Sequence, residues 1–325
     1  MTFSRRRFLE VCGGAGMATA AGLGMTGIAE AQAQAYPGAQ PVQWIIYQSP
    51  GGLVDTSSRT LQPYLAEQGV NTVFEYVRGA SGRIARTQLF RGKPDGYAMM
   101  TEASPEEVLG EVVFNADYKV SEFQPVIGWF VNAFNLYVRK DSNIKTFDDF
   151  VKAARTRSVT IGTLGRGGPS HLQIMLLRKA LNLNLQPVHF NGGAPTYAAV
   201  AGGHVEAAIG GSTSAKTAVD GRFLTVFRDG RDPALPDVPT VSELGFKIPS
   251  INEIIYINAG PGVPADRIQR LANAFTKAIE NPEQIAKQKN IGVYPKVITA
   301  AELRKAIQAE YGFVTEYKSE LAASS

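Results

Sequence analysis

Short apolar segments alternate with amphipathic segments along almost the whole chain, and this alternation constrains the fold more than any other feature. The apolar segments are β-branched or aromatic and end at Gly, Pro or Asn, which is typical of buried strands. We predict strands at Val42–Tyr47, Val73–Val77, Tyr97–Thr101, Leu136–Arg139, Val159–Gly162, Pro187–Phe190, Ala207–Ile209, Leu224–Phe227 and Ile254–Ala259. Helices between such strands favour an α/β fold with mostly parallel sheets.

Capping patterns indicate where several of the intervening helices begin. A hydroxyl precedes an acid by three residues at Ser104–Glu107, Thr146–Asp149, Thr240–Glu243 and Thr299–Glu302. Apolar stripes predict one helix from Pro264 and a last helix that runs to Leu321. Pro63 lies inside the helix that we expect from about Asp55. An interior proline costs about 3 kcal/mol, so we expect a kink there or two short helices.

The N-terminus has the three parts of an export signal. Ser4-Arg5-Arg6-Arg7-Phe8-Leu9 precedes a Gly- and Ala-rich apolar run, and overlapping A-x-A sites end at Ala35. The paired arginines favour a twin-arginine signal peptide over residues 1–35. A transmembrane anchor is the alternative, but the glycines make the run weakly apolar for a stable span. We therefore predict a soluble periplasmic protein, with no membrane insertion after cleavage.

The composition excludes several classes of function. The net charge is +4 and charged residues make up 19%, which argues against nucleic-acid binding because that needs clustered positive charge. Three histidines and one cysteine leave little material for a metal site. The cysteine, Cys12, leaves with the signal peptide, so we expect no disulfide. We expect no cofactor and no metal.

Four loops rich in glycine and hydroxyl groups follow predicted strands. They are Ser49–Gly52, Gly79–Gly82, Gly162–His171 and Asn191–Pro195. Ligands of open α/β sheets bind beyond the carboxyl ends of strands, and the helix N-termini there attract anions. Each loop could equally be an ordinary turn between a strand and a helix. Because four occur in one chain, we favour a shared anion site.

Enzyme motifs fail on inspection. Gly165–Ser170 resembles a dinucleotide fingerprint but ends in serine, and no Walker lysine follows a glycine run. Ser212 lacks the last glycine of a nucleophile elbow. Ser170 and His171 are neighbours on an expected helix and cannot easily pair. The carboxylates Glu106/Glu107 and Asp148/Asp149 fall in first helical turns, where they complement the helix dipole.

Three arginines lie in or beside the glycine loops. Arg83 and Arg166 fall inside loops, and Arg78 precedes one. A guanidinium there could bind a carboxylate through two parallel hydrogen bonds. For Arg166, a solvated surface arginine is an equally good interpretation. For Arg78 and Arg83 it is the favoured one.

These loops, taken in order, resemble a known family. From Pro41 to the C-terminus the chain is similar to the Bug-type solute receptors of tripartite tricarboxylate transporters. The matching segments are Pro50–Asp55, Gly79–Gly82, Lys93–Tyr97, Ser170–Leu172, Asp232–Thr240 and Gly260–Pro264. The resemblance implies a two-lobed class II periplasmic-binding-protein fold with a ligand cleft between the lobes. It also implies that small carboxylates are the ligands, held at the first glycine loop by amides, hydroxyls and waters.

The chain departs from the family pattern near the cleft. Phe190-Asn191-Gly192 stands where the family usually shows Tyr-Lys-Gly, so a hydroxyl and a cation are missing. Arg166, on the neighbouring loop, could restore that cation.

We therefore expect a periplasmic receptor that captures a small organic acid between two lobes and delivers it to membrane transporter subunits. It is expected to be a monomer and not an enzyme. A periplasmic enzyme or a signalling sensor on the same scaffold is the alternative. Lobe one is expected at residues 36–139 and 259–325, and lobe two at 140–258, with strands Leu136–Arg139 and Ile254–Ala259 at the hinge.

The predicted ligand-binding residues come from all four loops, and no catalytic residue is assigned. They are Ser49, Gly51, Gly52, Leu53, Thr56, Gly79, Ala80, Ser81, Gly165, Arg166, Gly167, Ser170, His171, Asn191, Gly192 and Ala194. Asp55 is excluded because one carboxylate would repel another, and we expect it to fix the first loop as a capping group.

Overall fold

The computed structural model describes residues 36–48, 50–190, 192–213 and 220–323. The predicted signal peptide and the predicted site residues Ser49 and Asn191 lie outside the described residues. Within those ranges, no helix is both long and apolar enough to cross a membrane.

The strands form one mixed sheet in the order β2–β1–β3–β9–β4–β7–β5–β6, and β8 and β10 also pair with β4. They are β1 (Val42–Ile46), β2 (Thr72–Tyr76), β3 (Ala98–Ala103), β4 (Gln124–Arg139), β5 (Val159–Thr163), β6 (Leu185–His189), β7 (Ala207–Gly211), β8 (Gly221–Phe227), β9 (Asn252–Ala259) and β10 (Ile298–Thr299). The α/β fold is confirmed. Parallel pairs join β1 to β2 and β3, and β5 to β6 and β7, whereas every antiparallel pair involves β4 or β9.

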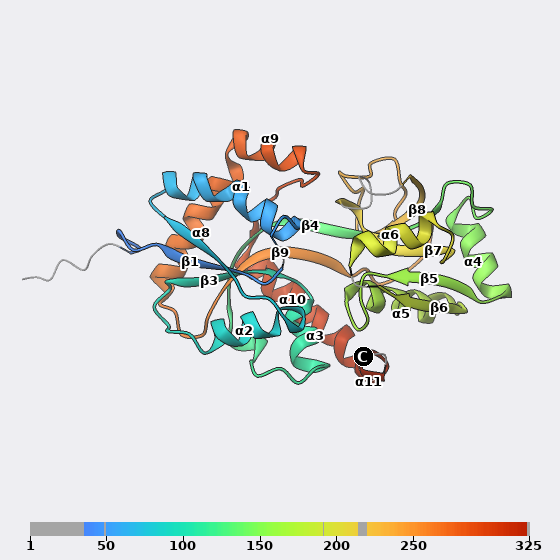
Figure 1. Ribbon diagram of the computed structural model, residues 1–325, viewed down its shortest axis with the longest axis horizontal. Coiled ribbons are helices and arrows are strands. Elements are labelled where there is room, and N and C mark those ends of the chain that lie inside the picture. Colours follow the sequence, from blue (N-terminus) through green and yellow to red (C-terminus); the bar gives the residue numbers. More distant parts are fainter. Residues whose placement is uncertain (1–35, 49, 191, 214–219, 324–325) are drawn as a thin grey trace, which may run out of the picture. The chain divides into compact units, whose positions relative to one another are not determined.

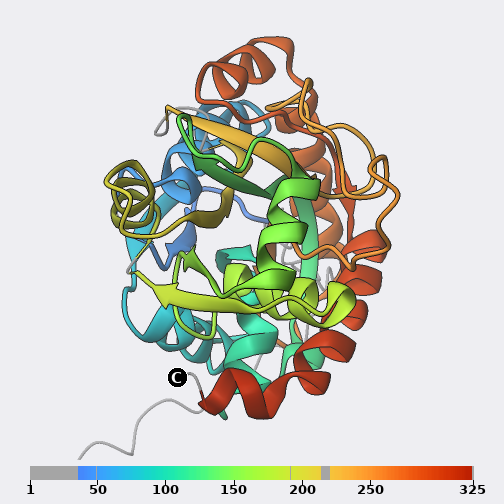
Figure 2. The same cartoon turned by 90° about the vertical axis from the view of Figure 1, so that its right-hand side faces the viewer.

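Helices flank this sheet in two groups (Figure 1). The first lies with β1, β2 and β3, and the second with β5, β6 and β7. The helices are α1 (Leu53–Glu67), α2 (Arg83–Phe90), α3 (Glu106–Val112), α4 (Phe147–Thr156), α5 (Pro169–Leu181), α6 (Gly193–Ala201), α8 (Ala265–Glu280), α9 (Pro282–Asn290), α10 (Ala300–Glu316) and α11 (Lys318–Ala323). Short 3₁₀ turns, η1 (Ala80–Gly82) and η2 (Val120–Glu122), complete the elements. In Figure 2 the red C-terminal helices lie at the lower edge.

β4 belongs to both groups. Over its 16 residues, Gln124–Ala133 pairs with β9, and Phe134–Arg139 pairs with β7 and β8. The sequence predicted only Leu136–Arg139 of the second part, because Gly128 and Asn132 interrupt the apolar pattern of the first part and Asn135 interrupts it just before Leu136. The predicted division into two lobes remains a prediction.

Two of the four predicted capping boxes are confirmed as helix starts. Thr146 caps α4 and Thr299 caps α10, each with reciprocal hydrogen bonds to the acid three residues on. Thr240 and Glu243 exchange the same bonds but close a turn outside any helix. The prediction at Ser104 is wrong: its buried hydroxyl accepts a hydrogen bond from the Ile254 N–H at 3.3 Å, so the backbone of β9 has displaced the cap.

Two helix predictions also change. α1 is one helix through Pro63, not two short ones; Pro63 is exposed, so water can solvate the carbonyl that its missing N–H leaves unpaired. The single predicted last helix is divided into α10 and α11 at Tyr317. The apolar stripe predicted for the helix from Pro264 was Ile268, Leu271, Phe275 and Ile279. In α8 the last three are buried and Ile268 is partly buried, and Phe275 packs edge-on against Trp44 of β1.

Candidate functional site

A cavity of about 380 Å³ opens between the two groups of elements. Its volume falls in the range of small-molecule sites. Its lining comes from the loops after β1, β5 and β6, from η1, α2, α3, α5 and α6, from the segment after α3, and from β4 and β9. The lining residues are Gln48, Ser81, Arg83, Glu106, Leu109, Gly110, Phe114, Phe134, Leu164, Gly165, Arg166, Gly167, Gly168, Pro169, Ser170, Gly192, Gly193 and Glu253.

The loop from Leu164 to Ser170 forms one wall of the cavity. Two hydrogen bonds to the first turn of α5 fix the shape of this loop. The Leu164 N–H donates to Ser170 Oγ at 2.9 Å, and the Gly167 N–H donates to His171 Nδ1 at 3.2 Å. Gly167 has φ +68, and a Cβ there would lie 3.1 Å from Phe114 Cζ, so only glycine fits easily. The Gly165 and Arg166 N–H groups donate to no group among the described residues. They are free to bind an anion ahead of α5.

The loop before α6 lies against that wall. The Gly192 N–H donates to the Leu164 carbonyl at 2.8 Å, and Thr196 Oγ1 donates to the Gly192 carbonyl at 2.7 Å. Gly192 and Gly193 line the cavity, whereas the predicted site residue Ala194 is exposed and does not. The N-terminal ends of α5 and α6 therefore meet at one side of the cavity.

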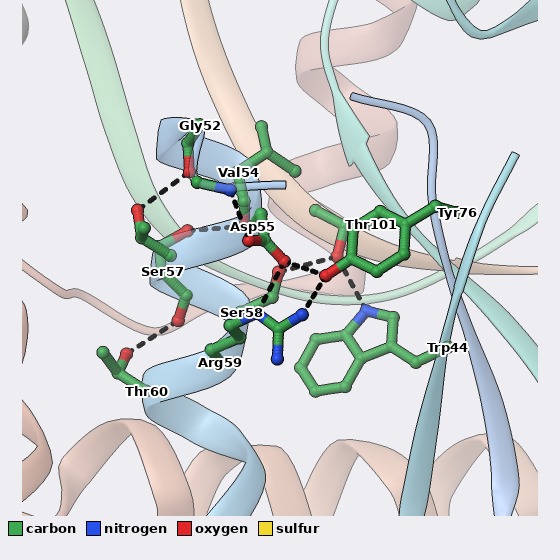
Figure 3. A network of polar contacts seen from close by, with 12 residues as sticks. Trp44, Gly52, Val54, Asp55, Ser57, Ser58, Arg59, Thr60, Tyr76 and Thr101 are labelled. Atoms are coloured by element: carbon green, nitrogen blue, oxygen red, sulfur yellow. Dashed lines mark hydrogen bonds and ion pairs between the residues drawn. The ribbon is translucent and has the colours of Figure 1, made fainter. Parts of the chain in front are cut away.

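The first glycine loop is bound to α1 by a polar network that Figure 3 shows. Asp55 Oδ2 accepts from the Gly51 N–H at 2.7 Å, and Asp55 Oδ1 accepts from Arg59 Nε at 2.9 Å and from the Tyr76 hydroxyl. The expectation that Asp55 fixes the loop is confirmed. The Gly51 N–H is thereby already paired, and Thr56 Oγ1 donates to the Gly52 carbonyl at 2.9 Å. None of Gly51, Gly52, Leu53 and Thr56 lines the cavity.

The second predicted loop brings one residue to the cavity, Ser81. Ala80 and Ser81 have φ of 50 and 51, which is unusual for residues other than glycine. Arg86 Nη1 donates to the Ser81 carbonyl at 2.7 Å and so holds this backbone. Gly79 and Ala80 are exposed outside the cavity lining.

Two arginines line the cavity. Arg83 is partly buried, and its guanidinium lies 4.4 Å from the centre of the Phe114 ring. Arg166 is exposed on the wall loop. Neither forms a salt bridge with any described residue. Arg83, which the sequence left as a surface arginine, thus joins Arg166 at the cavity.

Two glutamates that the sequence did not predict as site residues also line the cavity. Glu106 is the first residue of α3, and Glu253 lies on β9, where Oε2 accepts from Asn132 Nδ2 at 2.8 Å. Burial, and then the charge of Glu106, raise the pKa of Glu253 to about 7. Burial also raises the pKa of Glu106, against the opposing charge of Arg86. Glu106 and Glu253 are far apart in the sequence, so no local sequence pattern indicates that both line the cavity.

His171 lies behind the wall loop and not in the cavity lining. It is 3% exposed and packs edge-on against His189 at 4.5 Å between ring centres. Burial, with the charge of His189 next, lowers the pKa of His171 to about 4, so its ring is neutral and accepts from the Gly167 N–H. His171 therefore shapes the loop.

Six of the predicted site residues line the cavity: Ser81, Gly165, Arg166, Gly167, Ser170 and Gly192. Whether they bind a ligand stays a prediction. Eight described ones lie outside its lining: Gly51, Gly52, Leu53, Thr56, Gly79, Ala80, His171 and Ala194. Among the described residues, no group of three or more His, Cys, Asp or Glu side chains could hold a metal ion.

Comparison with known protein families gives one match. The model for the tripartite tricarboxylate transporter family receptor matches residues 58–314. Among individual proteins, the chain is 28% identical over 291 residues to the UPF0065 protein in the TAR-I ttuE-ttuC' intergenic region of Agrobacterium vitis, covering 86% of this chain and 84% of that one. It is 25% identical over 293 residues to the protein BugT of Bordetella pertussis, covering 87% and 89%.

Solved structures share the fold. The protein Rpa4515 of R. palustris, solved with adipate, superposes with a TM-score of 0.74 at 22% identity, over 89% of this chain and 98% of that chain. MatC of Rhodopseudomonas palustris, solved with bound malate, gives a TM-score of 0.70 at 21% identity, over 86% and 99%. At these identities the likeness shows a common fold.

Proposed function

Because the chain belongs to the receptor family of tripartite tricarboxylate transporters, we propose that its cavity binds a small organic acid in the periplasm and that the loaded receptor delivers the acid to membrane transporter subunits. The resemblance to Bug-type receptors is confirmed by the family match and by the similarity to BugT. The periplasmic location and the twin-arginine route rest on Arg5 and Arg6 and on the family.

The observation that carries the ligand class is a pair of arginines, with no acidic partner among the described residues, on a cavity that also receives two helix N-termini. Arg83 and Arg166 can each bind a carboxylate through charge-assisted hydrogen bonds, worth roughly 1.5–3 kcal/mol each. The Gly165 and Arg166 N–H groups add neutral donors. Relatives of the same fold were solved with malate and with adipate, which supports an acid of similar size.

A receptor of this kind releases its ligand unchanged. The cavity lining includes Ser81 and Ser170, but Ser170 Oγ accepts from the Leu164 N–H, and among the described residues neither hydroxyl is hydrogen-bonded to a histidine or to the cavity glutamates Glu106 and Glu253. A hydroxyl that is not hydrogen-bonded to a base is a weak nucleophile. We therefore propose binding and transport, and not turnover.

The test is to identify what the protein binds. The mature protein is purified natively, and mass spectrometry analyses the small molecules that it releases on denaturation. Each candidate acid, with malate and adipate first, is then titrated while the unfolding midpoint is followed. A ligand that binds only the folded state raises the midpoint with concentration. Release of no organic acid, together with a midpoint that no acid moves, would contradict the proposal.

A further inference from the structure

The cavity lining carries acidic groups near the start of α3 and a basic group beside its second turn. Glu106 begins the helix, and Gly110 follows one turn later. A Cβ on Gly110 would lie 3.4 Å from Arg83 Cγ, which places the arginine beside that second turn. The rise between the two positions is roughly 6 Å at 1.5 Å per residue. A short aliphatic molecule can therefore touch both ends.

The acidic end lacks compensating positive charge. Glu253 forms no salt bridge with any described residue, and its neighbour Asn132 is neutral. Glu106 Oε2 lies 3.4 Å from Arg86 Nη2, but Arg86 is fully buried and its Nε and Nη2 both donate to Glu102. One arginine thus serves two carboxylates, so ionisation of both Glu106 and Glu253 leaves surplus negative charge on the cavity side. Both carboxyls have a raised pKa, and a bound cation would favour their ionised forms.

The end of the cavity at the two arginines has surplus positive charge. Arg83 and Arg166 have no acidic partner among the described residues, as shown above. A diacid would satisfy this end but would bring its second carboxylate toward Glu106 and Glu253. Like charges at short range in a partly desolvated cavity repel, whereas a cation there is attracted by both glutamates.

We propose that the cavity selects an amino-bearing organic acid, whose carboxylate binds beside Arg83 and Arg166 and whose cationic amino group binds between Glu106 and Glu253. This inference rests on the proposed function, since it specifies which acids the same cavity takes. Glu253 and Glu106 are then the residues that determine specificity. Gln48 and Phe134, which also line the cavity, are neutral.

The experiment compares ligands that differ in one end only. Adipate is matched with 6-aminohexanoate, and malate with 4-amino-3-hydroxybutanoate, which replace one carboxylate by an aminomethyl group. Isothermal titration of the purified mature protein at neutral pH measures each affinity. We expect the amino acid of at least one pair to bind roughly tenfold tighter than its diacid, as one charge-assisted contact would give.

The variants Glu253→Gln and Glu106→Gln test whether these two carboxylates cause the preference for the amino ligand. Glutamine at position 253 keeps an oxygen that can accept from Asn132, so the β9 contact is retained. Each variant should lose most of the preference for the amino ligand, while the affinity for the diacid is unchanged or rises. Glu67→Gln removes one charge from an exposed position outside the cavity lining and should leave the preference intact. Unfolding curves of all three establish that they fold.

The possible failures are distinguishable. If wild type prefers the diacid of both pairs, or if Glu253→Gln and Glu106→Gln keep the amino preference, the inference is overturned and the receptor for organic acids stands. If the folded protein binds neither member of either pair and releases no organic acid when denatured, the proposed function falls with it.

Discussion

Asp55 accepts a hydrogen bond from the backbone N–H of Gly51 at 2.7 Å, which closes the first glycine loop on the first turn of α1. The carboxylate is 2% exposed and also accepts from Arg59 and Tyr76. Burial alone would raise the pKa of Asp55, but the bonds from Gly51, Tyr76 and Arg59 outweigh it and lower the pKa below its ordinary value. This carboxylate stabilises the loop in its ionised form.

Asp55→Asn should therefore destabilise the protein by about 1–3 kcal/mol, because an amide accepts fewer of these bonds and leaves a buried donor unpaired. Denaturant unfolding at neutral pH measures the loss. Asp141→Asn is the control, since Asp141 is exposed and pairs with Arg139 at the surface, where little change is expected. As pH falls through the lowered pKa of Asp55, the parent should lose this stability and approach the variant. A constant difference down to strongly acidic pH would contradict the assignment.

Gly110 should tolerate no side chain. A Cβ there would lie 1.9 Å from the Tyr118 hydroxyl oxygen, inside the core beside the cavity. Gly110→Ala should cost about 1–3 kcal/mol, as overpacking does. Gly312→Ala on α10 is the matched control: nothing lies within 4 Å, so the better helix propensity of alanine should stabilise by up to about 1 kcal/mol.

The same clash predicts a rescue. Tyr118→Phe removes the hydroxyl, so it should restore part of the stability that Gly110→Ala loses, although it also removes the hydrogen bond to the Glu107 carbonyl. The double-mutant cycle measures the coupling. Additive effects of the two substitutions would mean that the Tyr118 hydroxyl is not what excludes the methyl group.

The two cavity arginines should contribute unequally. Arg83 is partly buried and stacked on Phe114, whereas Arg166 is exposed, and ion pairs gain strength as water is excluded. Arg83→Ala should weaken binding of the preferred acid by roughly tenfold or more, and Arg166→Ala by a few-fold. Calorimetric titration checks both, with Arg91→Ala, outside the cavity lining, as control. An equal loss would make Arg166 a direct clamp.

Glu253 should make stability depend on pH in the direction opposite to Asp55. Because its folded pKa is raised to about 7 from 4.5, the unfolded chain loses the proton first, and stability falls as pH rises between those values. Glu253→Gln cannot ionise, so its stability relative to the parent should increase over that window and level off above it. Urea unfolding at a series of pH values measures the difference. A difference that is flat with pH would show that Glu253 titrates normally.

Export supplies the last prediction. Arg5→Lys together with Arg6→Lys should keep the precursor in the cytoplasm, because the exporter of folded proteins recognises the arginine pair. Cell fractionation measures the periplasmic yield, and Arg7→Lys, which leaves the pair intact, is the control. Normal periplasmic yield from the double variant would leave only a general secretory signal.

The sequence predicted the strands well because most are short, uninterrupted apolar runs bounded by turn residues. It failed where tertiary contacts override a local pattern. Ser104 has the spacing of a cap, yet the β9 backbone uses its hydroxyl. Gly128 and Asn132 interrupt the apolar pattern of the first part of β4, so the sequence did not predict that part, although pairing with β9 holds it as a strand.

The sequence also predicted only part of the site, because tertiary contacts bring some of its residues together. Glycine loops show where backbone approaches a cavity, so Gly165, Gly167 and Gly192 were found. Glu106 was interpreted as a partner of the helix dipole, and nothing around Glu253 distinguishes it from any acid in a strand. The cavity brings them together only because α3 and β9 meet in space, which no spacing along the chain reveals.

The continuity of β4 limits how this protein can be divided. A piece that ended before β4 would contain β3 without its antiparallel partner β9, and a piece that began after β4 would leave β7, β8 and β9 without the strand with which all three pair. An exposed strand edge of that kind recruits other chains and aggregates. The halves on either side of the cavity are thus not interchangeable modules, and a gene for either half alone would have to supply a substitute for this strand.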